Sequence, residues 1–241
     1  MKKTLLTICL VWMCFSLSAQ KIIDLSGKWS FSIDRQDNGE KEKWFSHTLN
    51  DFINLPGSMP EKLKGDEVTA KTQWTGSLYD SSYYYNPYME KYRKEGNIKF
   101  PFFLTPDKHY VGAAWYQKEV NIPADWKGER ILLFLERPHI ETTVWVNGQK
   151  TGMQNSLCVP HQYDITRYVR PGKCTITIRV DNRIKEINVG PDSHSITDQT
   201  QGNWNGIVGR ICLQTTPKTY FDDIQIYLSL IHISEPTRPE P

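Results

Sequence analysis

A polar–apolar alternation with a period of two residues constrains the fold of this chain more than any other feature. Lys28–Asp34 and Thr175–Asp181 both place every second apolar side chain on the same side of an extended backbone. Such segments form strands that bury one face and expose the other. We therefore expect these inward-facing residues to build the core: Trp29, Phe31, Val144, Val146, Ile176, Ile178 and Val180.

Turn signals separate the alternating segments at short intervals. Asn147-Gly148 is typical of a tight hairpin, since both residues tolerate positive φ, and Pro171-Gly172 precedes another strand. Helical periodicity is suggested only near residues 88–94. Short strands with frequent turns predict an all-β fold, an antiparallel β-sandwich of the jelly-roll type.

The N-terminus has the features of a secretory signal peptide. The basic pair Lys2-Lys3 precedes a mostly apolar run, Leu5–Leu17, which is too short to span a bilayer and is followed by small residues. We expect residues 1–19 to be cleaved near Ala19, which leaves an exported, periplasmic or extracellular protein without a membrane segment. Lipidation at Cys14 is the alternative, although no small residue directly precedes that cysteine.

The C-terminal residues lose the strand pattern. Asp223–Tyr227 reads as a final strand, whereas residues 228–239, LSLIHISEPTRP, resemble the translation of a sequencing-library adapter. We expect residues 228–241 to be non-native, adapter-derived sequence, with an ordinary polar tail as the alternative. The residues between the signal and this tail, 20–227, suit one large β domain.

Charge and cysteine content exclude several classes of function. The chain has 29 basic and 27 acidic residues, and two of the basic ones lie in the signal. No basic stripe stands out, so we expect no nucleic-acid partner. Cys158, Cys174 and Cys212 lie outside the signal, and their spacing fits no metal site. We expect no metal or other cofactor. We also expect the three cysteines to be buried as small apolar residues.

Residues 73–110 break the strand rhythm and are rich in tyrosine, phenylalanine and tryptophan. A loop this long and aromatic either fills a small core of its own or packs against something else. We expect several rings between residues 79 and 110 to be incompletely buried. Such rings would mark an interface with another domain or the rim of a binding site.

Seven short motifs occur along the chain in the same order as in a known protein family. They are Leu25–Phe31, Leu55–Gly57, Ala113–Pro123, Val144–Gly152, Tyr163–Thr166, Ile178–Asn182 and Asn203–Ile211. Together they resemble the sugar-binding domain of glycoside hydrolase family 2, which includes β-galactosidases, β-glucuronidases and β-mannosidases. The resemblance extends over nearly the whole chain after the signal, from Leu25 to Tyr227.

This resemblance implies an antiparallel jelly-roll (galactose-binding-like) β-sandwich here. It also implies further domains in the same protein, an immunoglobulin-like sandwich and a (β/α)₈ barrel that carries two catalytic glutamates. One of them usually follows an asparagine, yet the chain contains no Asn-Glu dipeptide and has no room for a barrel of roughly 250 residues. We therefore assign no catalytic residue here.

The chain is accordingly interpreted as the inactive N-terminal part of an exported, retaining β-glycosidase. Its expected partners are a β-linked carbohydrate and the missing C-terminal domains of the same protein. The alternatives are a free-standing carbohydrate-binding module and an adhesion sandwich without a sugar ligand.

The resemblance also points to a loop, Ser193–Trp204, that reaches the barrel and helps to bind the terminal sugar. It contains the candidate substrate-binding residues, which are His194, Asp198, Asn203 and Trp204. Three can hydrogen-bond to sugar hydroxyls, and the indole can stack on an apolar sugar face. Some family members carry a sugar-binding aspartate two residues before this tryptophan, where Gly202 stands here. Core packing of Trp204 and solvated turns elsewhere, including Glu136–His139, are the plainer interpretations.

Overall fold

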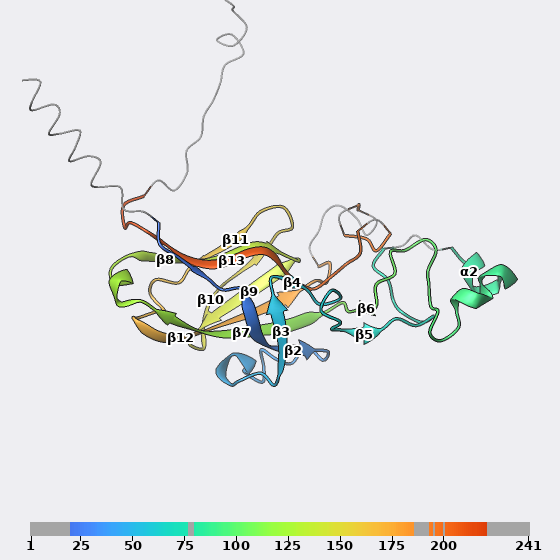
Figure 1. The fold of residues 1–241 in the computed structure, drawn as a ribbon, viewed down its shortest axis with the longest axis horizontal. Coiled ribbons are helices and arrows are strands. Elements are labelled where there is room, and N and C mark those ends of the chain that lie inside the picture. Colours follow the sequence, from blue (N-terminus) through green and yellow to red (C-terminus); the bar gives the residue numbers. More distant parts are fainter. Residues whose placement is uncertain (1–19, 77–79, 186–192, 195, 200, 221–241) are drawn as a thin grey trace, which may run out of the picture.

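The structure is a computed structural model that describes residues 20–76, 80–185, 193–194, 196–199 and 201–220. Two antiparallel sheets pack face to face (Figure 1). The first has the order β1–β13–β8–β11, with β4 also paired to β13. Its strands are β1 (Ile22–Asp24), β4 (Gly57–Ser58), β8 (Arg130–Pro138), β11 (His161–Asp164) and β13 (Gly206–Thr216).

The second sheet has six strands in the order β10–β9–β12–β7–β2–β3. They are β2 (Gly27–Asp34), β3 (Asp51–Leu55), β7 (Ala113–Ile122), β9 (Glu141–Val146), β10 (Gln149–Asn155) and β12 (Gly172–Asp181). The expected hairpin at Asn147-Gly148 joins β9 to β10, with φ of 50° and 76° at its two residues. These sheets confirm the all-β, antiparallel sandwich predicted from the alternation.

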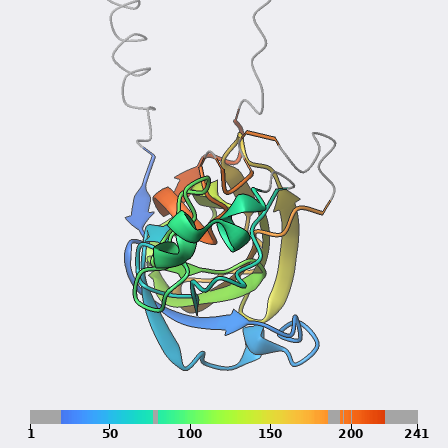
Figure 2. The same cartoon turned by 90° about the vertical axis from the view of Figure 1, so that its right-hand side faces the viewer.

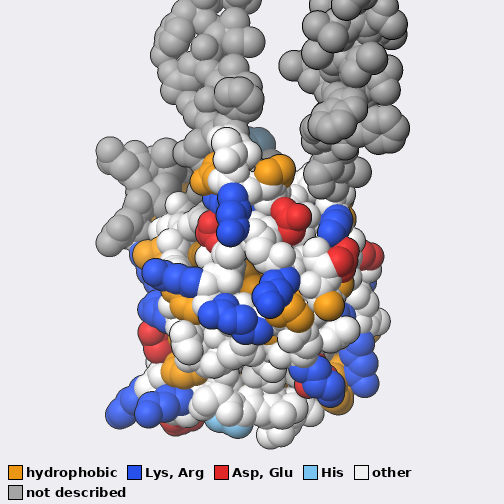
Figure 3. All heavy atoms as spheres, turned by 90° about the vertical axis from the view of Figure 1, so that its left-hand side faces the viewer, with side chains coloured by type: hydrophobic (Ala, Val, Ile, Leu, Met, Phe, Trp, Pro, Cys, Tyr) orange, Lys and Arg blue, Asp and Glu red, His pale blue; other side chains and the backbone are white. Residues whose placement is uncertain are grey.

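A long excursion, residues 73–110, leaves the sandwich at one end (Figures 1 and 2). Its elements are α2 (Ser82–Tyr85), η2 (Pro87–Tyr92) and β6 (Lys108–His109), which pairs with β5 (Asp66–Glu67). Two further 3₁₀ helices are η1 (Trp44–Ser46) and η3 (Ala124–Trp126). At the opposite end of the sandwich, basic, acidic and hydrophobic side chains are interspersed on the surface (Figure 3).

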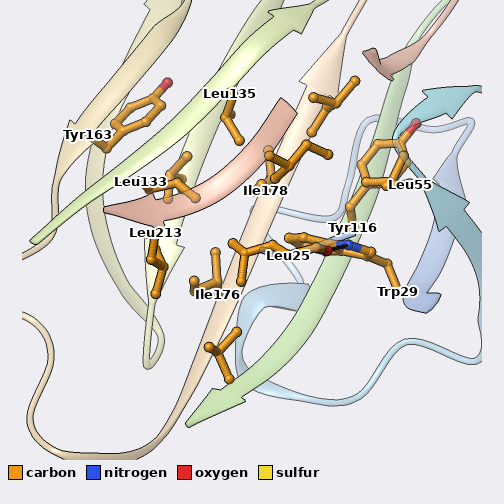
Figure 4. Packing of buried hydrophobic residues seen from close by; sticks show 14 of the residues in the cluster. Leu25, Trp29, Leu55, Tyr116, Leu133, Leu135, Tyr163, Ile176, Ile178 and Leu213 are labelled. Atoms are coloured by element: carbon orange, nitrogen blue, oxygen red, sulfur yellow. Dashed lines mark hydrogen bonds between the residues drawn. The ribbon is translucent and has the colours of Figure 1, made fainter. Parts of the chain in front are cut away.

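The core lies between the two sheets, as the period-two pattern predicts. All seven residues expected to face inward are at most 1% exposed. Trp29 packs beside Tyr116, and Ile176 and Ile178 of β12 face Leu133 and Leu213 of the other sheet (Figure 4). The register of the strands is therefore the predicted one, because a slip by one residue would turn these side chains outward.

The expectation that the Thr175–Asp181 strand buries only one face is wrong. Thr177 is 1% exposed although it points away from the core, and Trp145 of the neighbouring strand is 2% exposed. The segment before β3 covers this outer face, where Phe45 stacks on Trp145 at 5.2 Å and Trp44 contacts Trp115. The six-stranded sheet is thus covered on both sides over part of its area.

The cysteines only partly match the expected burial. Cys174 and Cys212 are buried, whereas Cys158 is exposed after β10, and none of the three forms a disulfide. Within the described residues no helix is long and apolar enough to cross a membrane. The segment expected to be a signal peptide, the strand expected at 223–227 and the C-terminal tail lie outside the described residues.

Candidate binding cleft at one end of the sandwich

An open cleft of about 770 Å³ lies where the excursion meets the loop before β13. One wall consists of residues 98–107 of the excursion, and the other consists of Asp198 and residues 201–204. The excursion wall is largely apolar, with Phe100, Phe103 and Leu104, while Lys99 and Asp107 bring charges. A cleft of this size, with apolar walls and a few polar groups, is typical of a small-molecule site.

Trp204 presents part of its indole to this cleft. The residue is partly exposed, lines the cleft and stacks on the imidazole of His139, with ring centroids 4.6 Å apart and planes at 28°. It lies outside the hydrophobic core clusters, so the plain core interpretation does not describe it. One indole face is held by His139, and the ring is therefore placed to stack on an apolar ligand surface.

His139 supports the indole as a neutral ring. Its side chain is buried, and this burial lowers the pKa of His139 to about 4. The imidazole is therefore uncharged near neutral pH and can pack against Trp204 without a buried charge. The interpretation of Glu136–His139 as a solvated turn is wrong for His139. This residue directly follows the C-terminal end of β8, which pairs there with the N-terminal end of β13.

Two buried asparagines fix the backbone on either side of Trp204. Asn205 donates from Nδ2 to the carbonyls of Gly112 and Val180, at 2.9 Å each, and its Oδ1 accepts from the Tyr116 hydroxyl at 2.7 Å. Because every polar atom of the amide is used internally, this residue is an anchor. Trp204, which lies between these two asparagines in the chain, is partly exposed and lines the cleft.

Asn203 is an anchor as well, although the sequence made it a candidate for sugar binding. Its Nδ2 donates to Thr75 Oγ1 and to the Asn182 carbonyl at 3.0 Å, and its Oδ1 accepts from Asn182 Nδ2 at 3.0 Å. It is 4% exposed. Asn203 lines the cleft, but its amide hydrogens are committed to the protein.

Asp198 joins the two walls of the cleft. Its carboxylate accepts from the backbone N–H groups of Thr75 and Asn203, both at 2.6 Å, and its own N–H donates to the Thr75 carbonyl at 3.0 Å. The Asp198 carbonyl accepts from Leu104 N at 3.3 Å. At 1% exposure, this carboxylate therefore holds the excursion against the loop before β13.

His194 differs from the other three candidates. It is exposed and is absent from the described residues that line the cleft, whereas Asp198, Asn203 and Trp204 all line it. Parts of the predicted loop, residues 195 and 200, lie outside the described residues. Sequence reasoning places residues 98–107 only within an aromatic segment at an interface or the rim of a site, and it favours a solvated turn for Glu136–His139 over a position at the cleft.

The excursion fills a small core of its own and also leaves several rings exposed. It builds a small aromatic core in which Tyr83 stacks on Phe100 at 4.6 Å and Trp74 contacts Phe100 and Phe103. At its tip, three tyrosines remain exposed, namely Tyr84, Tyr85 and Tyr88. The expectation of several incompletely buried rings is thus confirmed.

Comparison with known proteins agrees with this architecture. Residues 22–217 match the family model described as "Glycosyl hydrolases family 2, sugar binding domain". The chain is 25% identical to the β-glucuronidase of Homo sapiens over 235 residues, which cover 86% of this chain and 30% of the human protein. It is 27% identical to the β-glucuronidase of Paenibacillus borealis over 164 residues, or 68% of this chain and 21% of that protein.

Solved structures show the same fold. A β-glucuronidase of an uncultured Clostridium sp. aligns with a TM-score of 0.55 at 21% identity, over 83% of this chain and 30% of that one. A Ruminococcus gnavus β-glucuronidase aligns with a TM-score of 0.56 at 18% identity, over 83% and 29%. The chain thus spans less than a third of these relatives. By its family match over most of its length, the chain belongs to glycoside hydrolase family 2, and residues 22–217 are its sugar-binding domain.

Proposed function

We propose that this chain is the N-terminal sugar-binding domain of an exported, retaining family 2 glycosidase that hydrolyses terminal β-glucuronides. The observation that carries the proposal is the cleft, in which a partly exposed Trp204 is held between two buried asparagines and faces an apolar wall. The curated relatives compared above are β-glucuronidases, and this name selects the sugar. The signal-like residues 1–19 support export.

The groups around the cleft suit binding and not bond cleavage. An indole stacks on the apolar face of a sugar ring, and exposed Lys99, Asp107 and Gln201 at the edges offer hydrogen bonds to hydroxyl groups. Retaining hydrolysis needs two carboxyl groups about 5–5.5 Å apart on opposite sides of the glycosidic bond. Asp198, the buried acid at the cleft, is occupied by two backbone N–H groups, so we place the catalytic pair in another domain.

Turnover of an aryl glycoside tests this assignment. The full-length protein should hydrolyse 4-nitrophenyl β-glucuronide, and the 241-residue chain alone should not, since it lacks a positioned acid and nucleophile. A full-length protein that hydrolyses no aryl β-glycoside would contradict the proposal. Glucuronide binding by such an inactive protein would favour the free-standing carbohydrate-binding module instead.

Substitution of Trp204 by alanine should raise the KM of the full-length protein for the glucuronide about fivefold, because stacking by one aromatic ring is worth roughly 1 kcal/mol. The fold should persist, since the flanking asparagines keep their partners. The matched control is Trp44→Ala, which truncates another partly buried tryptophan on the outer face of the six-stranded sheet. If both variants change KM equally, Trp204 has no specific role in binding.

A further inference from the structure

Three tyrosines form an exposed aromatic group at the tip of the excursion. Tyr84, Tyr85 and Tyr88 are 41%, 72% and 85% exposed, and they lie within five residues of one another on α2 and η2. Figure 1 shows α2 at the end of the excursion, away from the sheets. Elsewhere in the described residues, most large exposed hydrophobic side chains occur singly along the chain. This local concentration requires a physical reason.

Internal contacts hold the tip in place. Tyr83 is buried beneath the exposed rings, its hydroxyl donates to the Tyr92 carbonyl at 2.8 Å, and the Arg93 guanidinium donates to the Tyr83 carbonyl. The Asn86 side chain caps η2 by accepting from Tyr88 N at 3.0 Å. The backbone that carries the exposed rings is therefore ordered before any ligand arrives, which lowers the entropy lost on binding.

Ring contacts connect the tip of the excursion to the wall of the cleft. Phe100 lines the cleft and stacks on Tyr83 with centroids 4.6 Å apart and planes at 27°. Tyr83 in turn makes an edge contact with exposed Tyr84, at 5.0 Å and 89°. One buried ring, that of Tyr83, thus lies between the cleft wall and exposed Tyr84.

The chemistry of the tip favours a saccharide over a protein partner. Charged, exposed side chains flank the three tyrosines in sequence, namely Asp80, Glu90, Lys91, Lys94 and Glu95. The buried centre of a protein interface is depleted in charge and needs continuous contact. Separate tyrosine rings suit a glycan better, because each offers a flat apolar face to one sugar unit and a hydroxyl beside it.

We propose that Tyr84, Tyr85 and Tyr88 form an outer saccharide platform, which binds the inner units of an oligosaccharide whose terminal sugar occupies the cleft. This inference rests on the proposed function and adds to it a substrate class, namely glycans of several sugar units in preference to small aryl glycosides. Removal of the three rings then weakens binding of the long ligand and leaves the short one unaffected.

The experiment compares two ligands on the full-length protein. The probes are 4-nitrophenyl β-glucuronide and a hyaluronan hexasaccharide with glucuronate at its non-reducing end, with affinity measured by titration calorimetry and the aryl glycoside also followed by turnover. The triple variant Tyr84→Ala/Tyr85→Ala/Tyr88→Ala should bind the hexasaccharide at least tenfold more weakly. Its kcat/KM for the aryl glucuronide should stay within about twofold of the unmodified protein.

Matched variants and the remaining outcomes separate the explanations. Phe52→Ala removes a solitary exposed ring on β3 and should change the affinity for neither ligand. Tyr85→Phe/Tyr88→Phe should retain most of the affinity for the hexasaccharide, because the ring faces remain. Equal affinity of the triple variant and the unmodified protein for the hexasaccharide overturns the platform. A lower melting temperature with equal losses on both ligands also overturns it, and indicates that another domain covers the tip. Absence of aryl-glucuronide turnover in the unmodified protein contradicts the proposed function separately.

Discussion

Replacing Asn205 by aspartate is expected to destabilise the folded chain by about 4 kcal/mol, although the two side chains have the same shape. The amide nitrogen of Asn205 donates to the carbonyls of Gly112 and Val180 at 2.9 Å each. A carboxylate oxygen in its place would face two carbonyl oxygens without a proton to share. The side chain is fully buried, so water cannot relieve this opposition.

Urea unfolding of the chain measures this change directly. Asn147→Asp is the matched control, because it makes the same exchange at an exposed turn where the retained Oδ1 still accepts from Thr175 N at 2.9 Å. The control should lose less than about 1 kcal/mol. If Asn205→Asp proved as mild as Asn147→Asp, the amide would not anchor the backbone beside Trp204, and the account of the cleft would fail with it.

The inner face of the sandwich could be predicted because it depends on local alternation alone. Ile176 and Ile178 point inward whatever covers the other side of the sheet, so a period of two is sufficient. The burial of Thr177 and Trp145 could not be predicted in this way. This burial depends on the segment before β3, whose Phe45 stacks on Trp145 of the outer face. The alternation within a strand does not reveal which other segment covers its outer face.

The candidate site was predictable in position but not in the role of each residue. Asp198, Asn203 and Trp204 are close in sequence, and the structure places all three at one cleft. Whether a polar side chain there meets a ligand or the protein depends on distant backbone groups, such as those of Thr75, that nearby residues do not reveal. Residues 98–107 reach the site through the Leu104–Asp198 contact, which likewise has no local signature.

A buried ion cluster fastens the end of β12 beside the cleft. Asp181 is fully buried, and its carboxylate accepts from Arg179 at 3.0 Å and from Arg183 at 2.6 Å, with Lys185 at 2.8 Å. Burial by itself would raise the pKa of Asp181, but hydrogen bonds from Arg183 and Lys185 outweigh it and hold the pKa below its ordinary value. The next residue, Asn182, belongs to the network that anchors Asn203.

Asp181→Asn is therefore expected to cost about 3 kcal/mol at pH 7, because the mostly buried Arg179 keeps its charge and loses a partner. Since the folded pKa lies below the unfolded one, this stabilisation is present above about pH 4 and is lost on further acidification. The difference between variant and unmodified chain should shrink accordingly in urea unfolding at pH 7, 5 and 3. Asp125→Asn, which breaks an exposed pair with Lys21, should change nothing measurable. A pH-independent difference would show that Asp181 acts through packing and not through its charge.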